Sequence, residues 1–213
     1  AGRARSIWFH VEASILDQVL ANRSTIVFVN SRGLAERMTA RLNELYAERF
    51  SETFTTEAES EPLHYLASNA GTGNRSAGLP PLVARSHHGS VSKERRNEIE
   101  QDLKSGDLRC VVATSSLELG IDMGLVDLVV QVAAPPSVSS GLQRVGRAGH
   151  HVGGTSAGLV YPRTRRDLVD SAVTVEKMLA GQLEAVHPPR NPLDILAQQT
   201  VAAVAMDTLN VEE

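Results

Sequence analysis

The chain has 213 residues, of which 42% are hydrophobic and 22% are charged, so it holds enough apolar material for one globular domain with a sizeable core. Its net charge of −4 excludes a polycation, and no apolar run approaches the roughly 18 residues that predict a transmembrane helix. The single cysteine, Cys110, excludes an internal disulfide. Its apolar neighbours, and a start without a secretory-signal pattern, predict a cytoplasmic protein with no membrane partner.

Short apolar runs alternate with helical patterns along the chain and predict an α/β fold. The runs cover residues 25–30, 83–88, 109–114, 126–132 and 157–162. They are continuous rather than alternating, which is typical of strands buried on both faces of a parallel sheet. Helical spacing is clearest over 31–50, 92–105 and 165–179, and Gly106 is a helix-stop signal. In such sheets ligands bind beyond the carboxyl ends of the strands, so the loops after the strands are the candidate site.

Two regions interrupt this alternation of strands and helices, and they define the expected domains. Residues 51–80 are acidic and rich in Ser, Thr, Asn and Gly, which predicts a long insertion loop. Residues 187–192, HPPRNP, form a proline-rich linker, and an apolar helical pattern follows it. We therefore expect one domain over residues 1–186, and over residues 187–213 the linker and first helix of a second, truncated domain.

The first two strand-end loops offer groups that suit phosphate. Residues 30–32, Asn-Ser-Arg, either cap the following helix or leave backbone N–H groups facing an anion, and the residues alone leave both readings open. Residues 87–90, His-His-Gly-Ser, combine a glycine that permits close backbone approach with a hydroxyl that can contact phosphate. The paired histidines also suit zinc, but no Cys, Asp or Glu lies nearby at ligand spacing.

The next two loops carry hydroxyls, a carboxylate and cations. Residues 114–116, Thr-Ser-Ser, offer hydroxyls at a helix start, and Asp122 can either accept a hydrogen bond from a sugar hydroxyl or cap a turn. In LQRVGRAGHH, residues 142–151, the three-residue spacing of Arg144, Arg147 and His150 forms a cationic row if the helix continues. The alternative is a surface helix end whose basic residues complement the helix dipole. The candidate helix caps are Ser137, Ser139 and Ser140.

Taken together and in order, these stretches resemble the second RecA-like motor domain of superfamily 2 helicases. IVFVNSR matches motif IV, ATSSLELGID matches motif V, QRVGRAGH matches motif VI, and HHGSVSKERR matches the segment between motifs IV and V. With SIWFHVE, LELGIDMG and NPLDILAQQTVA added, the chain is similar to the large helicase-related (Lhr) family of bacterial DNA helicases. The resemblance covers nearly the whole chain apart from residues 51–80. It implies a RecA-like parallel sheet flanked by helices, with the start of a winged-helix-like domain after it.

The resemblance implies that ATP, with Mg²⁺, binds in a cleft between this domain and a preceding RecA-like domain that supplies the phosphate loop and the metal ligands. Arg147 then matches an arginine finger, Arg144 its basic neighbour and Gln143 the opening of the motif. Many relatives have arginine where this chain has His150, which leaves a second finger role open. Gly120 and Asp122 match the residues at the nucleotide ribose. The residues that match the nucleic-acid side are Asn30, Ser31, Arg32, His88, Ser90, Thr114 and Ser115.

The sequence contains neither a G-x-x-x-x-G-K-[ST] phosphate loop nor a DEAH-like acidic motif, so we expect the chain to be inactive as an ATPase on its own. The resemblance implies one half of a 3′ to 5′ DNA helicase or translocase, nucleoid-associated and serving DNA repair. Single-stranded DNA is the expected partner, with an RNA–DNA hybrid as a second candidate. The alternatives are a nucleic-acid-binding or regulatory module with a degenerate motor and, disfavoured by the absence of G-x-G-x-x-G, a Rossmann-like enzyme.

Overall fold

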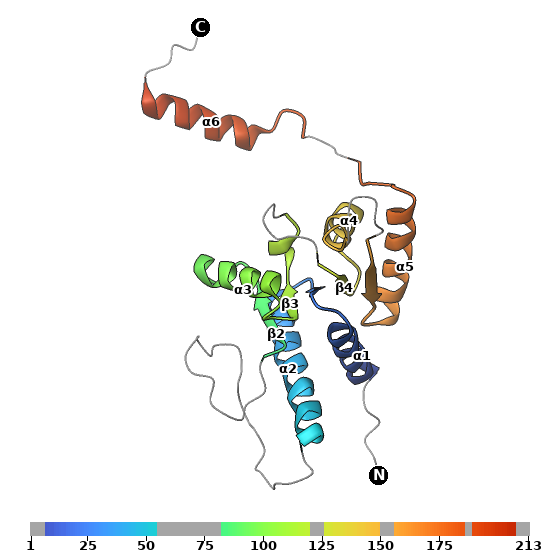
Figure 1. Ribbon diagram of the computed structural model, residues 1–213. Coiled ribbons are helices and arrows are strands. Elements are labelled where there is room, and N and C mark those ends of the chain that lie inside the picture. The colour runs from blue at the N-terminus through green and yellow to red at the C-terminus, as the bar shows by residue number, and fades with distance from the viewer. Residues whose placement is uncertain (1–6, 55–81, 120–125, 150–155, 186–188, 208–213) are drawn as a thin grey trace, which may run out of the picture. The chain divides into compact units, whose positions relative to one another are not determined.

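The computed structural model describes residues 7–54, 82–119, 126–149, 156–185 and 189–207, and the chain forms two compact units that divide between residues 183 and 184. The first unit is built on a parallel five-stranded sheet in the order β2-β3-β1-β4-β5 (Figure 1). Each strand lies within a predicted apolar run, so the predicted parallel α/β fold is confirmed. The strands are β1 (Thr25–Phe28), β2 (Ala84–His87), β3 (Cys110–Ala113), β4 (Leu128–Val132) and β5 (Gly158–Tyr161).

The central strands are buried at every position because both faces of the sheet are covered. β1 pairs with β3 on one side and β4 on the other, which brings Val27 level with Val112 and Val130. These three valines belong to the core on one face of the sheet, whereas Ile26 and Phe28 belong to the core on the other face. Alternate side chains point to opposite faces, so a strand between two cores needs an unbroken apolar sequence.

Helices α1 (Ile7–Ala21) and α2 (Arg32–Phe54) pack side by side over one face, and α3 (Lys93–Ser105) covers the other (Figure 1). Sequence reasoning did not identify α1, although it buries Ile15, Leu16 and Val19 completely. α2 runs to Phe54, so residues 51–54, predicted as the start of the insertion loop, are helical. The rest of that loop, residues 55–80, lies outside the described residues.

Polar residues define the ends of the helices that flank the candidate loops. Ser92 caps α3 by accepting a hydrogen bond from Arg95 N at 3.3 Å, and Gly106, with φ of 87°, ends it as predicted. Ser137, one of three predicted caps, begins α4 (Val138–Val145) by accepting from Ser140 N at 3.0 Å. Because α4 ends at Val145, the expected cationic row along one helix does not form, and Arg147 lies in the turn that follows.

The remaining elements complete the two units. α5 (Arg165–Leu179) follows β5 with the predicted bounds and packs on α4. In the second unit, α6 (Leu193–Met206) is the apolar helix predicted after the proline-rich linker. Cys110 is buried in β3, and burial raises the pKa of its thiol far above the ordinary value, so it is an inert core residue. None of the described helices is both long and apolar enough to cross a membrane.

Gly158 shows how closely α4 packs on the sheet. A Cβ atom at this position would lie 2.8 Å from Cγ2 of Val145, the residue that ends α4. A β-branched side chain in a helix has little rotamer freedom, so it cannot turn away. We expect Gly158→Ala to lower the free energy of unfolding by about 1–3 kcal/mol, measured by urea denaturation of this chain.

Gly89→Ala is the matched control, because nothing lies within 4 Å of its added Cβ. We expect it to change the free energy of unfolding by less than about 0.5 kcal/mol. Equal losses for the two variants would contradict the tight packing of α4 against β5.

Candidate functional site

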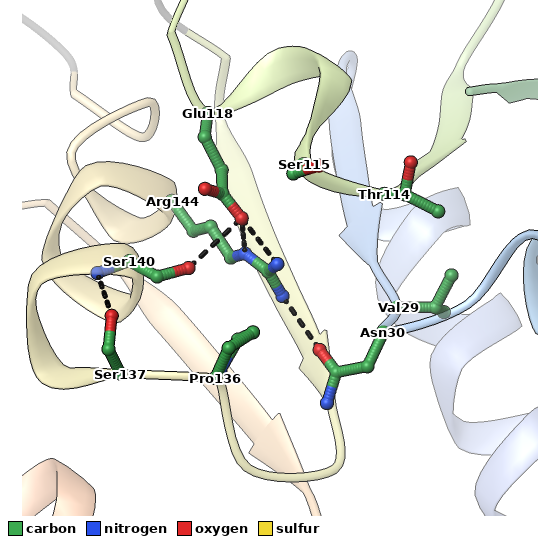
Figure 2. Close-up of a pocket in the computed structure, with 9 residues that line it drawn as sticks. All are labelled: Val29, Asn30, Thr114, Ser115, Glu118, Pro136, Ser137, Ser140 and Arg144. Carbon is green, nitrogen blue, oxygen red and sulfur yellow. Dashed lines mark hydrogen bonds and ion pairs between the residues drawn. The ribbon is translucent and has the colours of Figure 1, made fainter. Parts of the chain in front are cut away.

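The carboxyl ends of β1, β3 and β4 and the first turns of α4 surround an open pocket of about 360 Å³ (Figure 2). Strands of a parallel sheet end at the same edge, which is why loops distant in sequence meet here. The pocket brings together four predicted site residues, Asn30, Thr114, Ser115 and Arg144. Its full lining is Val29, Asn30, Thr114, Ser115, Glu118, Pro136, Ser137, Ser140 and Arg144.

Arg144 forms the inner wall of this pocket with a side chain that is only 2% exposed. Its Nε donates to Glu118 Oε1 at 2.7 Å, and its Nη2 donates to the same oxygen. Its Nη1 donates to Asn30 Oδ1 at 3.0 Å (Figure 2) and to Gln131 Oε1 at 2.8 Å. The guanidinium lies over the Phe28 ring. One cation thus joins the ends of β1 and β3 to β4 and α4.

Arg144 was predicted to face the nucleotide as a catalytic group, and the structure places its guanidinium in the interior of its own domain. The hydrogen bonds of its guanidinium run to side chains of its own domain. A buried ion pair needs such partners, because desolvating an unpaired guanidinium costs several kcal/mol. Arg144 therefore positions the surrounding loops.

Glu118 connects the two arginines of the predicted motif. Its carboxylate accepts from Arg144 and from Ser140 Oγ at 3.0 Å, and its backbone carbonyl accepts from Arg147 Nη2 at 2.7 Å. Arg147 is half-buried, and Gln143 is exposed on α4. The loop after β3 therefore sets the position of Arg147 in the turn after α4. Three predicted site residues, Gly120, Asp122 and His150, lie outside the described residues.

The predicted residues after β1 are held by contacts within the domain. The Asn30 amide donates to Ala134 O at 2.7 Å while its Oδ1 accepts from Arg144, so this side chain ties two strand ends together. Ser31 Oγ accepts from Leu34 N at 3.3 Å, which is the helix-capping role left open by the sequence. Arg32 is exposed at the start of α2, and its Nη1 donates to Ser90 Oγ at 2.8 Å. That bond joins two of the predicted loops.

His88 is buried, 6% exposed, and lies beneath the loop that carries Ser90. Its Nδ1 accepts from Ser90 N at 3.3 Å, so the ring proton lies on Nε2, which is 2.6 Å from Glu36 Oε1. His88, predicted to contact nucleic acid, thus holds the backbone of Ser90 in this structure. Among the described residues no group of three His, Cys, Asp or Glu side chains could hold a metal ion.

Sequence reasoning did not single out Glu118, Gln131 or Glu36, because none belongs to a recognisable ligand pattern. A signal for Glu118 does exist in the sequence. A buried arginine needs a carboxylate, and the stretch ATSSLELGID offers two, Glu118 and Asp122.

Family models match two parts of the chain. Residues 11–152 match the helicase conserved C-terminal domain, and residues 176–213 match the winged-helix domain of the large helicase-related protein. The first match covers the sheet from α1 to the turn after α4. The second begins within α5, earlier than the domain boundary expected at residue 187.

Named relatives and a solved structure resemble most or all of the chain. The Lhr helicase/uracil glycosylase of Escherichia coli is 65% identical over all 213 residues, and the ATP-dependent helicase Lhr-Core of Sulfolobus acidocaldarius is 37% identical over 89% of the chain. The chain spans 14% and 18% of the lengths of these relatives. The structure of Mycobacterium smegmatis helicase Lhr bound to ssDNA and AMP-PNP matches the full chain with a TM-score of 0.80 and 54% identity, over 24% of that protein.

The Arg144–Glu118 pair predicts a large and specific effect on stability. We expect Arg144→Met to lower the free energy of unfolding by about 3–5 kcal/mol, because it leaves the Glu118 carboxylate buried without its cation. Adding Glu118→Gln should restore part of the loss, since it removes the uncompensated charge. Urea denaturation of the single and double variants measures both effects.

Arg166→Met is the control, because Arg166 is 91% exposed and its ion pair with Asp170 spans 3.7 Å at the surface. Such pairs contribute about 0–1 kcal/mol. If Arg144→Met cost no more than Arg166→Met, the structural role of the buried pair would be refuted.

Proposed function

This chain belongs to the helicase conserved C-terminal domain family, as the second RecA-like domain of an Lhr-family helicase, and we propose that it is one half of an ATP-driven DNA motor. The observation that carries the proposal is the position of Arg147, held beside the strand-end loops by the Glu118 carbonyl. That single loop contact links the residue matched to ATP with the residues matched to nucleic acid. The chain is a part of a longer motor in this proposal, and alone it does not turn over ATP.

On the nucleotide side, Arg147 is the arginine finger. The carbonyl of Glu118 accepts from its Nη2 at 2.7 Å and orients its guanidinium. Bound ATP, held with Mg²⁺ mainly by the preceding domain, supplies the phosphoryl group whose transfer drives movement. Arg147 stabilises the negative charge that develops during this transfer. Gln143 lies nearby on α4, and Gly120, Asp122 and His150 remain proposed nucleotide contacts.

On the nucleic-acid side, the proposed binding site for single-stranded DNA consists of hydroxyl groups and one cation. Thr114 and Ser115 line the pocket, and Arg32 and Ser90 are exposed together on the neighbouring loops. Groups of this kind contact the sugar-phosphate backbone and carry no sequence information. The ssDNA in the M. smegmatis relative supports single-stranded DNA as the partner.

Family membership also supports the finer parts of the proposal. These are movement in the 3′ to 5′ direction, a role in DNA repair, and an RNA–DNA hybrid as a second candidate substrate. The winged-helix domain that begins in this chain and a preceding RecA-like domain are the proposed intramolecular partners.

The finger assignment predicts a loss of turnover. In the full-length protein, we expect Arg147→Ala to reduce kcat for ATP hydrolysis by about 10³–10⁵ at saturating single-stranded DNA, because the transition-state charge loses its cation. Arg166→Ala, which removes an exposed arginine on α5, should leave kcat unchanged. A normal kcat for Arg147→Ala in a folded protein would show that another group performs this role.

Backbone recognition predicts a uniform loss of DNA affinity. Arg32→Ala and Thr114→Ala should each weaken single-stranded DNA binding to a similar extent for every sequence tested. Arg32→Ala should also reduce the slope of log K against log salt concentration by about 0.7, whereas Thr114→Ala removes no charge and should keep the slope. Fluorescence anisotropy with three unrelated oligonucleotides measures both quantities. A loss confined to one sequence would indicate base contacts instead.

A further inference from the structure

His87 ends β2 and lies beneath the loop that follows β3. It is not among the proposed nucleotide or strand contacts. Its side chain is 2% exposed, and its Nδ1 is 2.8 Å from Ser116 Oγ. On the other side of the ring, Nε2 is 3.0 Å from Glu100 Oε1 on α3. The ring thus spans from a core helix to the β3 loop.

The backbone of His87 binds the same loop. Its carbonyl accepts from Thr114 N at 3.3 Å and from Ser116 Oγ at 2.9 Å. Ser116 belongs to the short helix Ser115–Leu117, and its neighbours Thr114 and Ser115 line the pocket. One residue of β2 therefore sets both ends of the segment that carries the pocket hydroxyls.

The proton positions follow from burial. Burial lowers the pKa of His87, and this effect outweighs the Glu100 carboxylate, which raises it. The neutral ring donates its one proton from Nε2 to Glu100, because a bare Nε2 would face a carboxylate. Nδ1 is then an acceptor, and the Ser116 hydroxyl shares its one proton between Nδ1 at 2.8 Å and the His87 carbonyl at 2.9 Å. Glu100 in this way selects the tautomer that holds Ser116.

We infer that His87 is a positioning residue for strand binding, which acts through Ser116 to place the Thr114 and Ser115 hydroxyls against the nucleic-acid backbone. This inference rests on the proposed function, since it needs those hydroxyls to contact the strand. A hydroxyl binds phosphate only within a narrow range of distance and angle, so a loop that shifts loses both contacts. Glu100 supports the role by fixing the ring.

Two substitutions separate positioning from simple packing. In His87→Asn, Oδ1 stands in for Nδ1 and can still accept from Ser116, while the bond to Glu100 is lost. In His87→Gln, Nε2 stands in for the ring Nε2 and can still donate to Glu100. The side-chain bond to Ser116 is lost, while the bond from Ser116 to the backbone carbonyl remains. Both remove the same ring from the core, so both should lower the Tm of the full-length protein to a similar extent.

We expect His87→Gln to weaken single-stranded DNA binding by about threefold to tenfold, the effect of about one hydrogen bond, with His87→Asn largely restoring affinity. Ser116→Ala, a smaller change that keeps the core intact, should lose at least as much affinity, because it also removes the bond to the His87 carbonyl. The double variant should lose no more than Ser116→Ala alone. Glu98→Gln, an exposed change on the same helix as Glu100, should leave affinity unchanged.

Thr114→Ala in the same titration separates this inference from the proposed function. If Thr114→Ala weakens binding but the two His87 variants bind alike, His87 is a packing residue and the inference fails while the strand site stands. If Thr114→Ala and His87→Gln both bind normally, the strand site itself is misplaced and the inference falls with it.

Discussion

The buried guanidinium of Arg144 is the constraint on which the arrangement of the site depends. A charged group at 2% exposure persists only if fixed partners replace its water, and here Glu118, Asn30 and Gln131 do so. These partners lie in or directly after three neighbouring strands of the sheet. Because one cation satisfies all of them, no strand-end loop can move alone without leaving a buried polar group unpaired.

Arg144 and Arg147 show how two like residues three positions apart acquire opposite roles. Arg144 lies in the last turn of α4 and points into the domain, where Glu118 pairs its charge. α4 ends at the next residue, so Arg147 leaves the helix and donates to the backbone carbonyl of the same glutamate. The early end of α4 therefore separates a structural cation from a proposed catalytic one, and Glu118 keeps their positions coupled.

Much of the fold follows from local sequence, whereas much of the site does not. The five strands were predictable because β1, β3 and β4 are buried on both faces and need continuous apolar runs. α1 was missed in the sequence, and its burial depends on α2 and the sheet. The tasks of Arg144 and His88 could not be predicted, since they depend on Glu118 and Glu36, which reach them only through the fold. Spacing showed which loops meet, but not which side chains turn inward.

The most direct test is a structure of the full-length protein with single-stranded DNA and a non-hydrolysable ATP analogue. The account predicts that Arg147 lies within hydrogen-bonding distance of the γ-phosphate while Arg144 stays on Glu118, with the DNA backbone against Thr114 and Ser115. An Arg144 side chain that leaves Glu118 for the phosphate, with Arg147 turned away from the nucleotide, would contradict the central claim.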